Sequence, residues 1–323
     1  MADDDHSAIT ASEAKLLFAD WKAAPAIVLA VSGGPDSIAL MWLAARWRRA
    51  LMRGPRLIAI TVDHGLRPEA AREARNVKKL ATQLDLPHRT LRWNGAKPKT
   101  GVPAAARAAR YRLLARAAKA GGATHILTAH TRDDQAETLL MRLARGAGLS
   151  GLAATRRRRP LEPGVMLVRP VLNWRRSELA AIVEAAGLTP VDDPTNRDPA
   201  HDRTRFRGLL ADADWADPER LASSAGWLAD ADEAIEWALS GLVATRLTAD
   251  AAGIAIDPAS LPRELQRRLL LVAFDRLGAS RPRGPDLDRA LNALTSGKAA
   301  TLSGLKLVGG ETWRLAKEGT RRR

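Results

Sequence analysis

Short apolar runs and longer helical segments alternate along the first two-thirds of the chain. The runs have the length of buried strands, and the segments between them have the length and apolar stripes of packed helices. Strands are predicted at residues 26–31, 57–62, 88–93, 125–130 and 165–168. Helices are predicted at residues 38–50, 69–84, 102–120, 133–145 and 175–186. This order predicts an α/β fold, with a parallel sheet covered by helices on both faces.

The pattern changes after Leu209, where acidic residues become frequent and the strand-helix alternation stops. The elements predicted there are helices at 218–247, 261–277 and 285–295 and a short hairpin at 300–315. We place the domain boundary within about ten residues of Arg207. The sequence therefore predicts an α/β domain at 1–207 and a smaller, mainly helical domain at 208–323.

The turn after the first predicted strand reads Ser32-Gly33-Gly34-Pro35-Asp36-Ser37. Two adjacent glycines allow positive φ and a close approach of the backbone to a ligand. Ser37 and the free N–H groups of the following helix can hold a phosphate. A Walker loop is longer and ends in Gly-Lys-Ser or Gly-Lys-Thr, so this is not an ordinary P-loop. The alternative to a phosphate loop is a plain turn with a serine or aspartate cap.

Two more polar turns follow predicted strands. Asp63 and His64 come after the second strand, and His130 ends the strand at 125–130. Because ligands bind outside the carboxyl ends of strands in such sheets, we expect these turns and the Ser32 loop to line one crevice. The alternative for each histidine is a hydrogen-bonded turn residue without a ligand.

Three acidic residues, Asp133, Asp134 and Glu137, begin the next predicted helix. Spacings of three and four residues bring their carboxylates toward one side of a helix. Carboxylates beside a phosphate site can bind Mg²⁺ or accept a proton from an amine. The alternative is structural, because Thr131 or Asp133 can cap the helix and acids are favoured in a first turn.

The positive charge is confined to the predicted α/β domain. The chain has a formal net charge of +15; residues 1–208 hold 35 Lys and Arg against 20 Asp and Glu, whereas residues 209–323 hold 16 of each. A basic surface in one domain indicates a polyanion partner, with nucleic acid ahead of an acidic membrane face. A solvated surface that serves solubility alone is the alternative.

Two arginine groups belong to this basic domain. Residues 156–159 are four consecutive arginines in a predicted loop, where they face water or contact a phosphate backbone. Arg203, Arg205 and Arg207 alternate with other residues, a spacing that suits one side of an extended segment or simple exposure to water.

Other patterns exclude classes of function. Gly146, Gly148 and Gly151 spell Gly-x-Gly-x-x-Gly, but they follow a helix rather than a strand, so a dinucleotide site is rejected. The amino terminus is acidic and no apolar run approaches about 18 residues, so a cytoplasmic protein without a membrane segment is predicted. The absence of cysteine excludes disulfides, iron–sulfur clusters, thiolate zinc sites and cysteine nucleophiles.

Together these motifs resemble those of the tRNA(Ile)-lysidine synthetases, a family of N-type ATP pyrophosphatases. This PP-loop superfamily, with its adenine nucleotide alpha hydrolase-like fold, splits ATP between the α and β phosphates. The Ser32 loop is typical of the superfamily, whereas Asp-His-Gly-Leu-Arg at 63–67 and the acidic helix followed by Arg-x-x-Arg-Gly point to this family. The resemblance covers about the first two-thirds of the chain, in the segments 32–37, 63–67, 107–111, 130–151, 169–172 and 193–196.

The sequence departs from the family pattern at 202–207. Asp-Arg-Thr-Arg-Phe-Arg stands there in place of the usual Arg-Asn-x-x-Arg, which puts the role of Arg203 in question. Many members also carry a further carboxyl-terminal domain, of which we expect no full copy here.

The resemblance implies roles for individual residues. The catalytic residues would be Asp36, Asp133, Asp134 and Glu137, the last three through recognition or deprotonation of lysine. Asp36 and Asp134 would also bind Mg²⁺. The residues implied to bind ATP are Ser32, Gly33, Gly34, Pro35, Asp36, Ser37, His64 and His130. The arginines implied to contact RNA phosphate or developing charge are Arg110, Arg145, Arg203 and Arg205.

The activity that the resemblance implies is that of a carbon–nitrogen ligase. It would join L-lysine to C2 of the wobble cytidine in the isoleucine tRNA with a CAU anticodon, through an adenylated cytidine, and so change codon reading from AUG to AUA. The partners would be ATP, L-lysine and this tRNA. The sequence leaves the oligomeric state open, with a homodimer as one alternative.

Three rival functions remain as alternatives. Thiolation of a tRNA base by another PP-loop enzyme requires cysteines, which this chain lacks. Small-molecule amide ligases such as GMP or NAD synthetases do not account for a basic surplus confined to one domain. A basic RNA-binding module with an inactive nucleotide site is the third, and the intact Ser32 loop and acidic helix argue against it.

Overall fold

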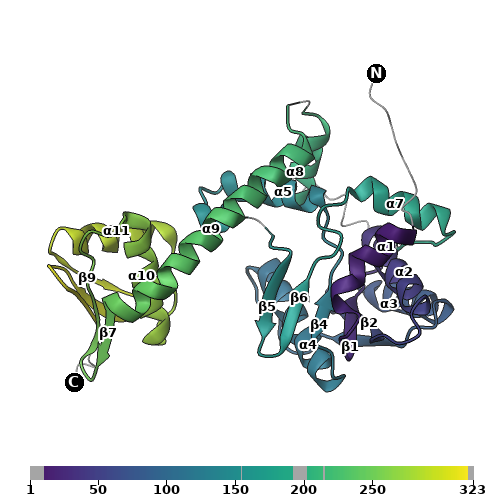
Figure 1. Cartoon of the computed structure of the whole chain (residues 1–323), viewed down its shortest axis with the longest axis horizontal. Coiled ribbons are helices and arrows are strands. Elements are labelled where there is room, and N and C mark those ends of the chain that lie inside the picture. The colour runs from purple at the N-terminus through teal and green to yellow at the C-terminus, as the bar shows by residue number, and fades with distance from the viewer. Residues whose placement is uncertain (1–10, 154, 192–201, 214, 319–323) are drawn as a thin grey trace. The chain divides into compact units, whose positions relative to one another are not determined.

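The computed structural model describes residues 11–153, 155–191, 202–213 and 215–318, and it divides into two compact units, Met1–Ala229 and Asp230–Arg323 (Figure 1). The division falls inside a long helix, whereas the sequence-based boundary lies near Arg207. The limits 1–207 and 208–323 for the functional domains stay a prediction. Within the described ranges, no helix is both long and apolar enough to cross a membrane.

The first unit is built on a six-stranded sheet with the strand order β3-β2-β1-β4-β6-β5. Its strands are β1 (Ala26–Ala30), β2 (Arg56–Asp63), β3 (His88–Arg92), β4 (His125–Leu127), β5 (Arg158–Glu162) and β6 (Val165–Val168). All neighbouring pairs are parallel except β5 with β6, which are antiparallel. The predicted parallel sheet is therefore confirmed, with one antiparallel strand added at its edge.

Helices cover both faces of this sheet, as predicted. Those of the first unit are α1 (Ala11–Phe18), the 3₁₀ helix η1 (Ala19–Trp21), α2 (Pro35–Arg49), α3 (Ala70–Gln83), α4 (Val102–Ala120), α5 (Arg132–Leu143), α6 (Leu149–Leu152), α7 (Arg176–Ala185), α8 (Asp202–Ala211) and the start of α9 (Pro218–Arg246). Alternate residues of β1 face opposite ways. Ile27 and Leu29 belong to a core with α1, α2 and α7, and Val28 belongs to a second core with α4.

The strand order places a switch point between β1 and β4. From β1 the chain proceeds outward to β2 and β3, and it then crosses to the other side of β1 to form β4. Loops that leave the carboxyl ends of β1 and β4 consequently diverge and leave a crevice between them. The Ser32 loop follows β1 and the segment 128–131 follows β4, so the topology brings the phosphate loop opposite the acidic helix α5.

One prediction about the arginine groups is wrong, and one of the two alternatives for the other group is excluded. The run at 156–159 was predicted as loop, but Arg158 and Arg159 begin the edge strand β5. Polar side chains suit this strand because it pairs on one side only, and Pro160 and a register shift after it are tolerated at such an edge. The segment with Arg203 and Arg207 is the helix α8 rather than an extended segment. A spacing of four residues places these two arginines on one face.

The second unit contains more strand than predicted. Its five-stranded antiparallel sheet has the order β7-β8-β11-β10-β9, and the predicted hairpin at 300–315 supplies part of it. The strands are β7 (Leu247–Asp250), β8 (Gly253–Ile256), β9 (Ala299–Leu302), β10 (Leu305–Val308) and β11 (Trp313–Lys317), and the helices are the end of α9, α10 (Arg263–Arg276) and α11 (Gly284–Thr295). The helices and one face of the sheet bury a core around Phe274, Leu291 and Trp313.

A buried cation joins α9 to α10 in the second unit. Arg268 has a side chain only 5% exposed, and it contacts Asp232 at 2.7 Å, Glu236 at 2.6 Å and Glu264 at 3.0 Å. Removing one partner of such a group leaves charges buried without compensation.

We therefore expect Arg268→Ala to lower the free energy of unfolding by about 3–5 kcal/mol, because the buried Asp232 carboxylate loses its counter-charge. Equilibrium urea unfolding followed by circular dichroism measures this. Arg289→Ala is the matched control, since Arg289 is 77% exposed in its pair with Asp286, and it should cost no more than about 0.5 kcal/mol. Equal losses in the two variants would contradict the role of the buried cluster.

Candidate active site

The Ser32 loop is a tight turn closed by one hydroxyl group. The N–H groups of Ser32 and Gly33 donate to Ser37 Oγ at 3.2 and 3.1 Å, and Ser37 Oγ donates to the Gly34 carbonyl oxygen at 2.9 Å. Gly34 is the N-cap of α2, and Pro35 follows in the first turn. The loop therefore ends directly in the N-terminus of a long helix, where N–H groups and the helix dipole favour an anion.

Gly33 has a backbone that other residues rarely adopt. Its φ is +100°, and a Cβ there would lie 2.9 Å from Cγ2 of Val191. The Gly33 carbonyl oxygen also accepts a hydrogen bond from Val191 N–H at 2.9 Å. Gly34, by contrast, has a φ of −68° and would have only Ser32 Oγ within 4 Å of a Cβ, at 3.9 Å. Of the two glycines, only Gly33 has a backbone conformation that favours glycine over other residues.

The acidic helix α5 begins with a capping box. Thr131 Oγ1 accepts from the Asp134 N–H at 3.3 Å, and Asp134 Oδ2 accepts from the Thr131 N–H at 2.8 Å. Asp133 does not cap α5; its Oδ2 accepts the backbone N–H of Arg176 at 2.8 Å. Asp133 therefore holds the first residue of α7 beside α5.

Three arginines converge on the carboxylates of α5. Glu137 is 0% exposed, yet its Oε1 lies 3.1 Å from Arg176 Nη1 and 2.9 Å from Arg207 Nε. Arg203 Nε lies 3.0 Å from Glu137 Oε2, an ion pair without hydrogen-bond geometry. Such a buried carboxylate is tolerated only because cations surround it.

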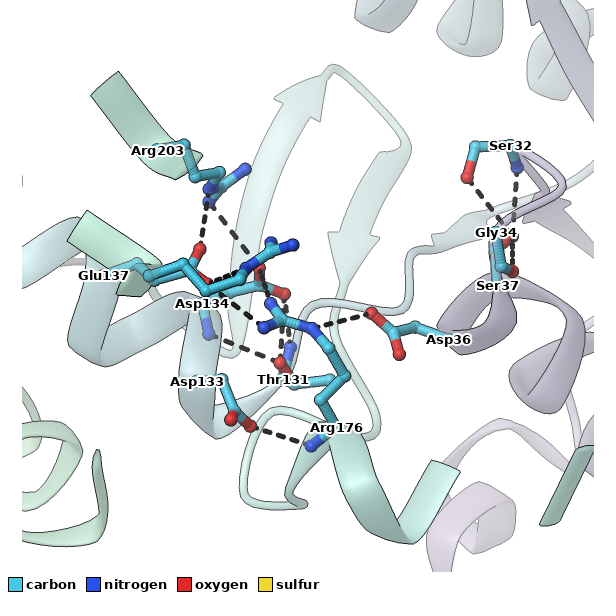
Figure 2. A network of polar contacts seen from close by, with 11 residues as sticks. Ser32, Gly34, Asp36, Ser37, Thr131, Asp133, Asp134, Glu137, Arg176 and Arg203 are labelled. Carbon is cyan, nitrogen blue, oxygen red and sulfur yellow. Dashed lines mark hydrogen bonds and ion pairs between the residues drawn. The ribbon is translucent and has the colours of Figure 1, made fainter. Parts of the chain in front are cut away.

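Arg176 also connects α5 to the phosphate loop. Its Nη2 lies 3.1 Å from Asp134 Oδ1 and its Nε lies 3.5 Å from Asp36 Oδ2. Figure 2 shows the Arg176 guanidinium with Asp36 on one side and Asp134 and Glu137 on the other. Although burial opposes it, these carboxylates raise the pKa of Arg176, so this side chain stays charged.

The carboxylates of the site differ in their protonation. Burial raises the pKa of Asp36 to about 6, and the nearby Asp134 and Asp133 add to the rise while Arg176 opposes it. Burial also acts to raise the pKa of Asp134, but Arg203 and Arg176 hold it below its usual range. Asp134 is consequently ionised near neutral pH, whereas Asp36 takes up a proton more easily than Asp134 does.

Both histidines that the sequence singled out lie at the expected edge of the sheet and are neutral. Burial, together with Arg169 and Arg110, lowers the pKa of His130 to about 3, and its Nδ1 lies 2.9 Å from Thr128 Oγ1. Burial and Arg110 also lower the pKa of His64. At neutral pH each ring can therefore bind a ligand through hydrogen bonds or ring contact but not as a cation.

These residues line two adjoining clefts rather than one crevice. The central cleft, of about 480 Å³, is lined by Ser32, Asp36, His130, Asp134 and Arg176 among others. A side cleft of about 270 Å³ contains His64, and Ser32 and Arg110 line both. Burial and the neighbouring Arg107 lower the pKa of Arg110. An arginine at the junction of two clefts suits an anionic ligand that extends through both.

The predicted arginines separate into two groups. Arg110 and Arg203 line the central cleft. Arg145 is 63% exposed, contacts Asp202, and lines a third cleft that also contains Arg107, Arg142, Arg203 and His130. Arg205 is 67% exposed, lies 3.8 Å from Asp202 and lines none of these three clefts. The segment 193–196 lies outside the described residues.

Sequence reasoning did not include Arg176 or Arg207 among the site residues. Their partners on α5 stand between 39 and 70 residues away along the chain, so no local pattern joins them. One signal was present for Arg176. It starts a predicted helix together with Arg175, and cations are disfavoured at a helix N-terminus unless acids compensate them.

The donor set fits a magnesium ion that arrives with a phosphate ligand. Asp36 Oδ1 is buried without a hydrogen-bond partner, which suits a cation. Among the described residues, no group of three or more His, Cys, Asp or Glu is placed to hold a metal ion. Mg²⁺ commonly binds through one or two carboxylates together with substrate phosphates and water, and Asp36 with Asp134 can supply the two carboxylates.

Comparison with known sequences gives a consistent result. Residues 7–213 match the PP-loop domain family. A tRNA(Ile)-lysidine synthase from Bradyrhizobium diazoefficiens is 56% identical over 87% of this chain and 81% of its own length. A protein of the same name from a second Bradyrhizobium strain is 49% identical over 98% of this chain and 95% of its own. A tRNA(Ile)-lysidine synthase from Zymomonas mobilis is 42% identical over 91% of this chain and 89% of its own length.

Among solved structures, the U34-tRNA thiolase NcsA from Methanococcus maripaludis, with its [4Fe-4S] cluster, shares the fold. The TM-score is 0.57 at 17% sequence identity, over 68% of this chain and 78% of that one. At this identity the likeness concerns the fold alone. It agrees with the mostly parallel sheet covered by helices.

We expect Gly33→Ala to lower the free energy of unfolding by about 1–3 kcal/mol, because alanine is strained at this φ and its Cβ meets Val191. Gly34→Ala is the control, and we expect it to cost less than about 1 kcal/mol, as for a glycine N-cap. Thermal and urea unfolding of both variants measure the difference. A Gly34 variant as unstable as the Gly33 variant would contradict this assignment.

We expect Asp36→Asn to stabilise the protein at pH 8 by up to about 3 kcal/mol. The pKa of Asp36 is about 6 in the folded state against 3.8 as the ordinary value. Between these values the folded state binds more protons than the unfolded state, so stability falls as the pH rises and the full penalty is present above pH 6. The gain from asparagine should vanish below about pH 4.

The measurement is urea unfolding of the ligand-free protein from pH 4 to pH 8. Asp85→Asn is the control, because its side chain is 85% exposed in a pair with Arg49, and its effect should stay within about 0.5 kcal/mol. A gain for Asp36→Asn that does not depend on pH would show that ionisation is not its cause.

Proposed function

Because the chain belongs to the tRNA(Ile)-lysidine synthase family, we propose that it is a carbon–nitrogen ligase that joins L-lysine to the wobble cytidine of the isoleucine tRNA with a CAU anticodon, with ATP as co-substrate. The observation that supports this best is the network of Arg176, in which one cation connects the phosphate loop to the acidic helix. We place this reaction in the cytoplasm.

The chemistry requires two displacements. In the first, O2 of cytidine attacks the α-phosphorus of ATP, the bond to the oxygen that bridges the α and β phosphates breaks, and pyrophosphate leaves. In the second, the ε-amine of lysine attacks C2, and the C2–O bond breaks. AMP departs with that oxygen and the amine loses a proton. A site for this reaction must hold pyrophosphate firmly and leave the α-phosphate accessible.

The Ser32 loop meets the first requirement, which is firm binding of pyrophosphate. The α2 N-terminus and the N–H groups of Ser32 and Gly33 form a compact anion site, and Ser37 Oγ satisfies those two groups until a phosphate replaces it. Mg²⁺ bound by Asp36 and Asp134 would neutralise phosphate charge and favour departure of pyrophosphate. Arg110 and Arg203, which line the same cleft, can stabilise charge that develops on the transferred phosphate.

The acidic residues of α5 have different roles in the second displacement, the attack by lysine. Glu137 is fully buried and surrounded by arginines, so we assign it the positioning of Arg203 and Arg207 rather than contact with lysine. Asp133 and Asp134 are the carboxylates of α5 that we assign to lysine. Burial keeps His130 neutral, and we assign it contact with the cytosine or ATP through hydrogen bonding rather than transfer of a proton.

The third cleft is the surface that we assign to RNA. Arg107, Arg142 and Arg145 line it, and it adjoins the central cleft at His130 and Arg203. Cations beside an opening that leads to the reacting groups suit phosphates that flank a nucleotide drawn out of its stack. The exposed Arg205 lies outside it and is assigned no contact with the reacting nucleotide.

We expect sustained release of pyrophosphate from ATP only when both L-lysine and the CAU-anticodon tRNA are present. The measurement is a coupled pyrophosphate assay together with mass analysis of nucleosides, in which cytidine should gain the mass of lysine less one water. The control is the same tRNA with its wobble cytidine replaced by guanosine, which should give no product. Turnover with lysine but without tRNA would refute the tRNA assignment.

A further inference from the structure

Arg176 occupies the space between the two carboxylates that the proposed function assigns to Mg²⁺. Its Nε lies 3.5 Å from Asp36 Oδ2, and its Nη2 lies 3.1 Å from Asp134 Oδ1. No other arginine among the described residues forms an ion pair with both. Figure 2 shows the guanidinium between the loop side and the α5 side of the site.

The guanidinium is held there by contacts that do not depend on Asp36. The backbone N–H of Arg176 donates to Asp133, and its Nη1 lies 3.1 Å from the buried Glu137. Helix α7 is itself fixed against α2, because Leu179 and Val183 lie in the same core as the apolar face of α2. Arg176 is therefore part of a built site rather than a mobile surface side chain.

The contact with Asp36 is the weakest of this network. At 3.5 Å it is the longest of the three carboxylate contacts, and the other oxygen, Asp36 Oδ1, is buried without a partner. One arginine therefore satisfies Asp36 only in part. Asp36 Oδ1 can therefore still accept a cation on the side that Arg176 does not reach.

A divalent cation and a guanidinium repel each other at such distances, and low water content strengthens the repulsion. A metal ion between Asp36 and Asp134 would therefore compete with Arg176 unless further negative charge arrived with it. The phosphates of ATP carry that charge, and arginine binds phosphate oxygens readily.

On the basis of the proposed function, we propose that Arg176 excludes free divalent cations from the Asp36–Asp134 pair and admits them only together with ATP. In the nucleotide-free protein its guanidinium lies between the two carboxylates and repels a second cation. When ATP enters, its phosphates offer Arg176 a second anionic partner, and the two carboxylates accept the metal. Arg176 is a positioning residue that makes metal binding depend on the nucleotide.

Binding of Mn²⁺, a paramagnetic substitute for Mg²⁺, tests this directly. The free-ion electron paramagnetic resonance signal is titrated with protein, with and without the α,β-methylene analogue of ATP, which resists α–β cleavage. Neither tRNA nor lysine is added. The variants are Arg176→Met, which removes the charge, and Arg176→Lys, which keeps it. Arg175→Met is the matched control, because Arg175 is the N-cap of the same helix but pairs with the exposed Glu219.

Wild type, Arg176→Lys and Arg175→Met should bind Mn²⁺ weakly without the analogue and at least about tenfold more tightly with it. Arg176→Met should bind Mn²⁺ at least about tenfold more tightly than wild type without nucleotide. Glu137 keeps Arg203 and Arg207 in this variant, so the fold should persist, and circular dichroism checks it.

Three results would overturn the proposal, in two distinguishable ways. If the wild type binds Mn²⁺ with the analogue but Arg176→Met gains no affinity without it, Arg176 does not exclude the metal, and the proposed function stands. Tight binding of Mn²⁺ by the nucleotide-free wild type would likewise show that Arg176 does not exclude the metal. If no variant binds Mn²⁺ even with the analogue, the metal assignment of the proposed function fails, and this inference fails with it.

Discussion

The buried carboxylate of Glu137 is the constraint on which the rest of the site depends. A charge with no exposure to water must be surrounded by counter-charge, and here the cations come from two helices that are distant in the sequence, α7 and α8. Satisfying this one group therefore fixes where α7 begins and how α8 lies on α5. Arg176, placed in this way, in turn reaches the phosphate loop.

The sheet explains why this network stands beside a phosphate site at all. Parallel strands direct their carboxyl ends to one edge, and the crossing of the chain from β3 to β4 separates the loops after β1 and β4. Local patterns were sufficient to predict the parallel sheet and the phosphate loop at its edge, because buried strands, helix lengths and a glycine-rich turn can each be recognised from neighbouring residues. The predicted order of elements and the parallel sheet were confirmed for the same reason.

The features that the sequence did not predict depend on packing between elements that are distant in the chain. Arg176 and Arg207 have partners on another helix, and nothing near them in the chain identifies those partners. Strand β5 was missed because an edge strand needs little apolar surface, and its arginines and proline resemble a loop. The alternating arginines of α8 were misjudged, since only packing on α5 distinguishes an inward-facing arginine such as Arg207 from an outward-facing one such as Arg205.

The edge strands also bear on how this protein behaves when it is concentrated. Strand β5 carries Arg158 and Arg159 with a proline and a register shift, and β3 at the opposite edge carries the exposed Arg89 and Arg92. Unpaired strand edges invite other chains to add to a sheet, and charge, proline and irregular register discourage this. Part of the basic surplus thus lies on the edges of the sheet, where charge discourages aggregation. A substitution that made these edges neutral would affect solubility before it affected catalysis.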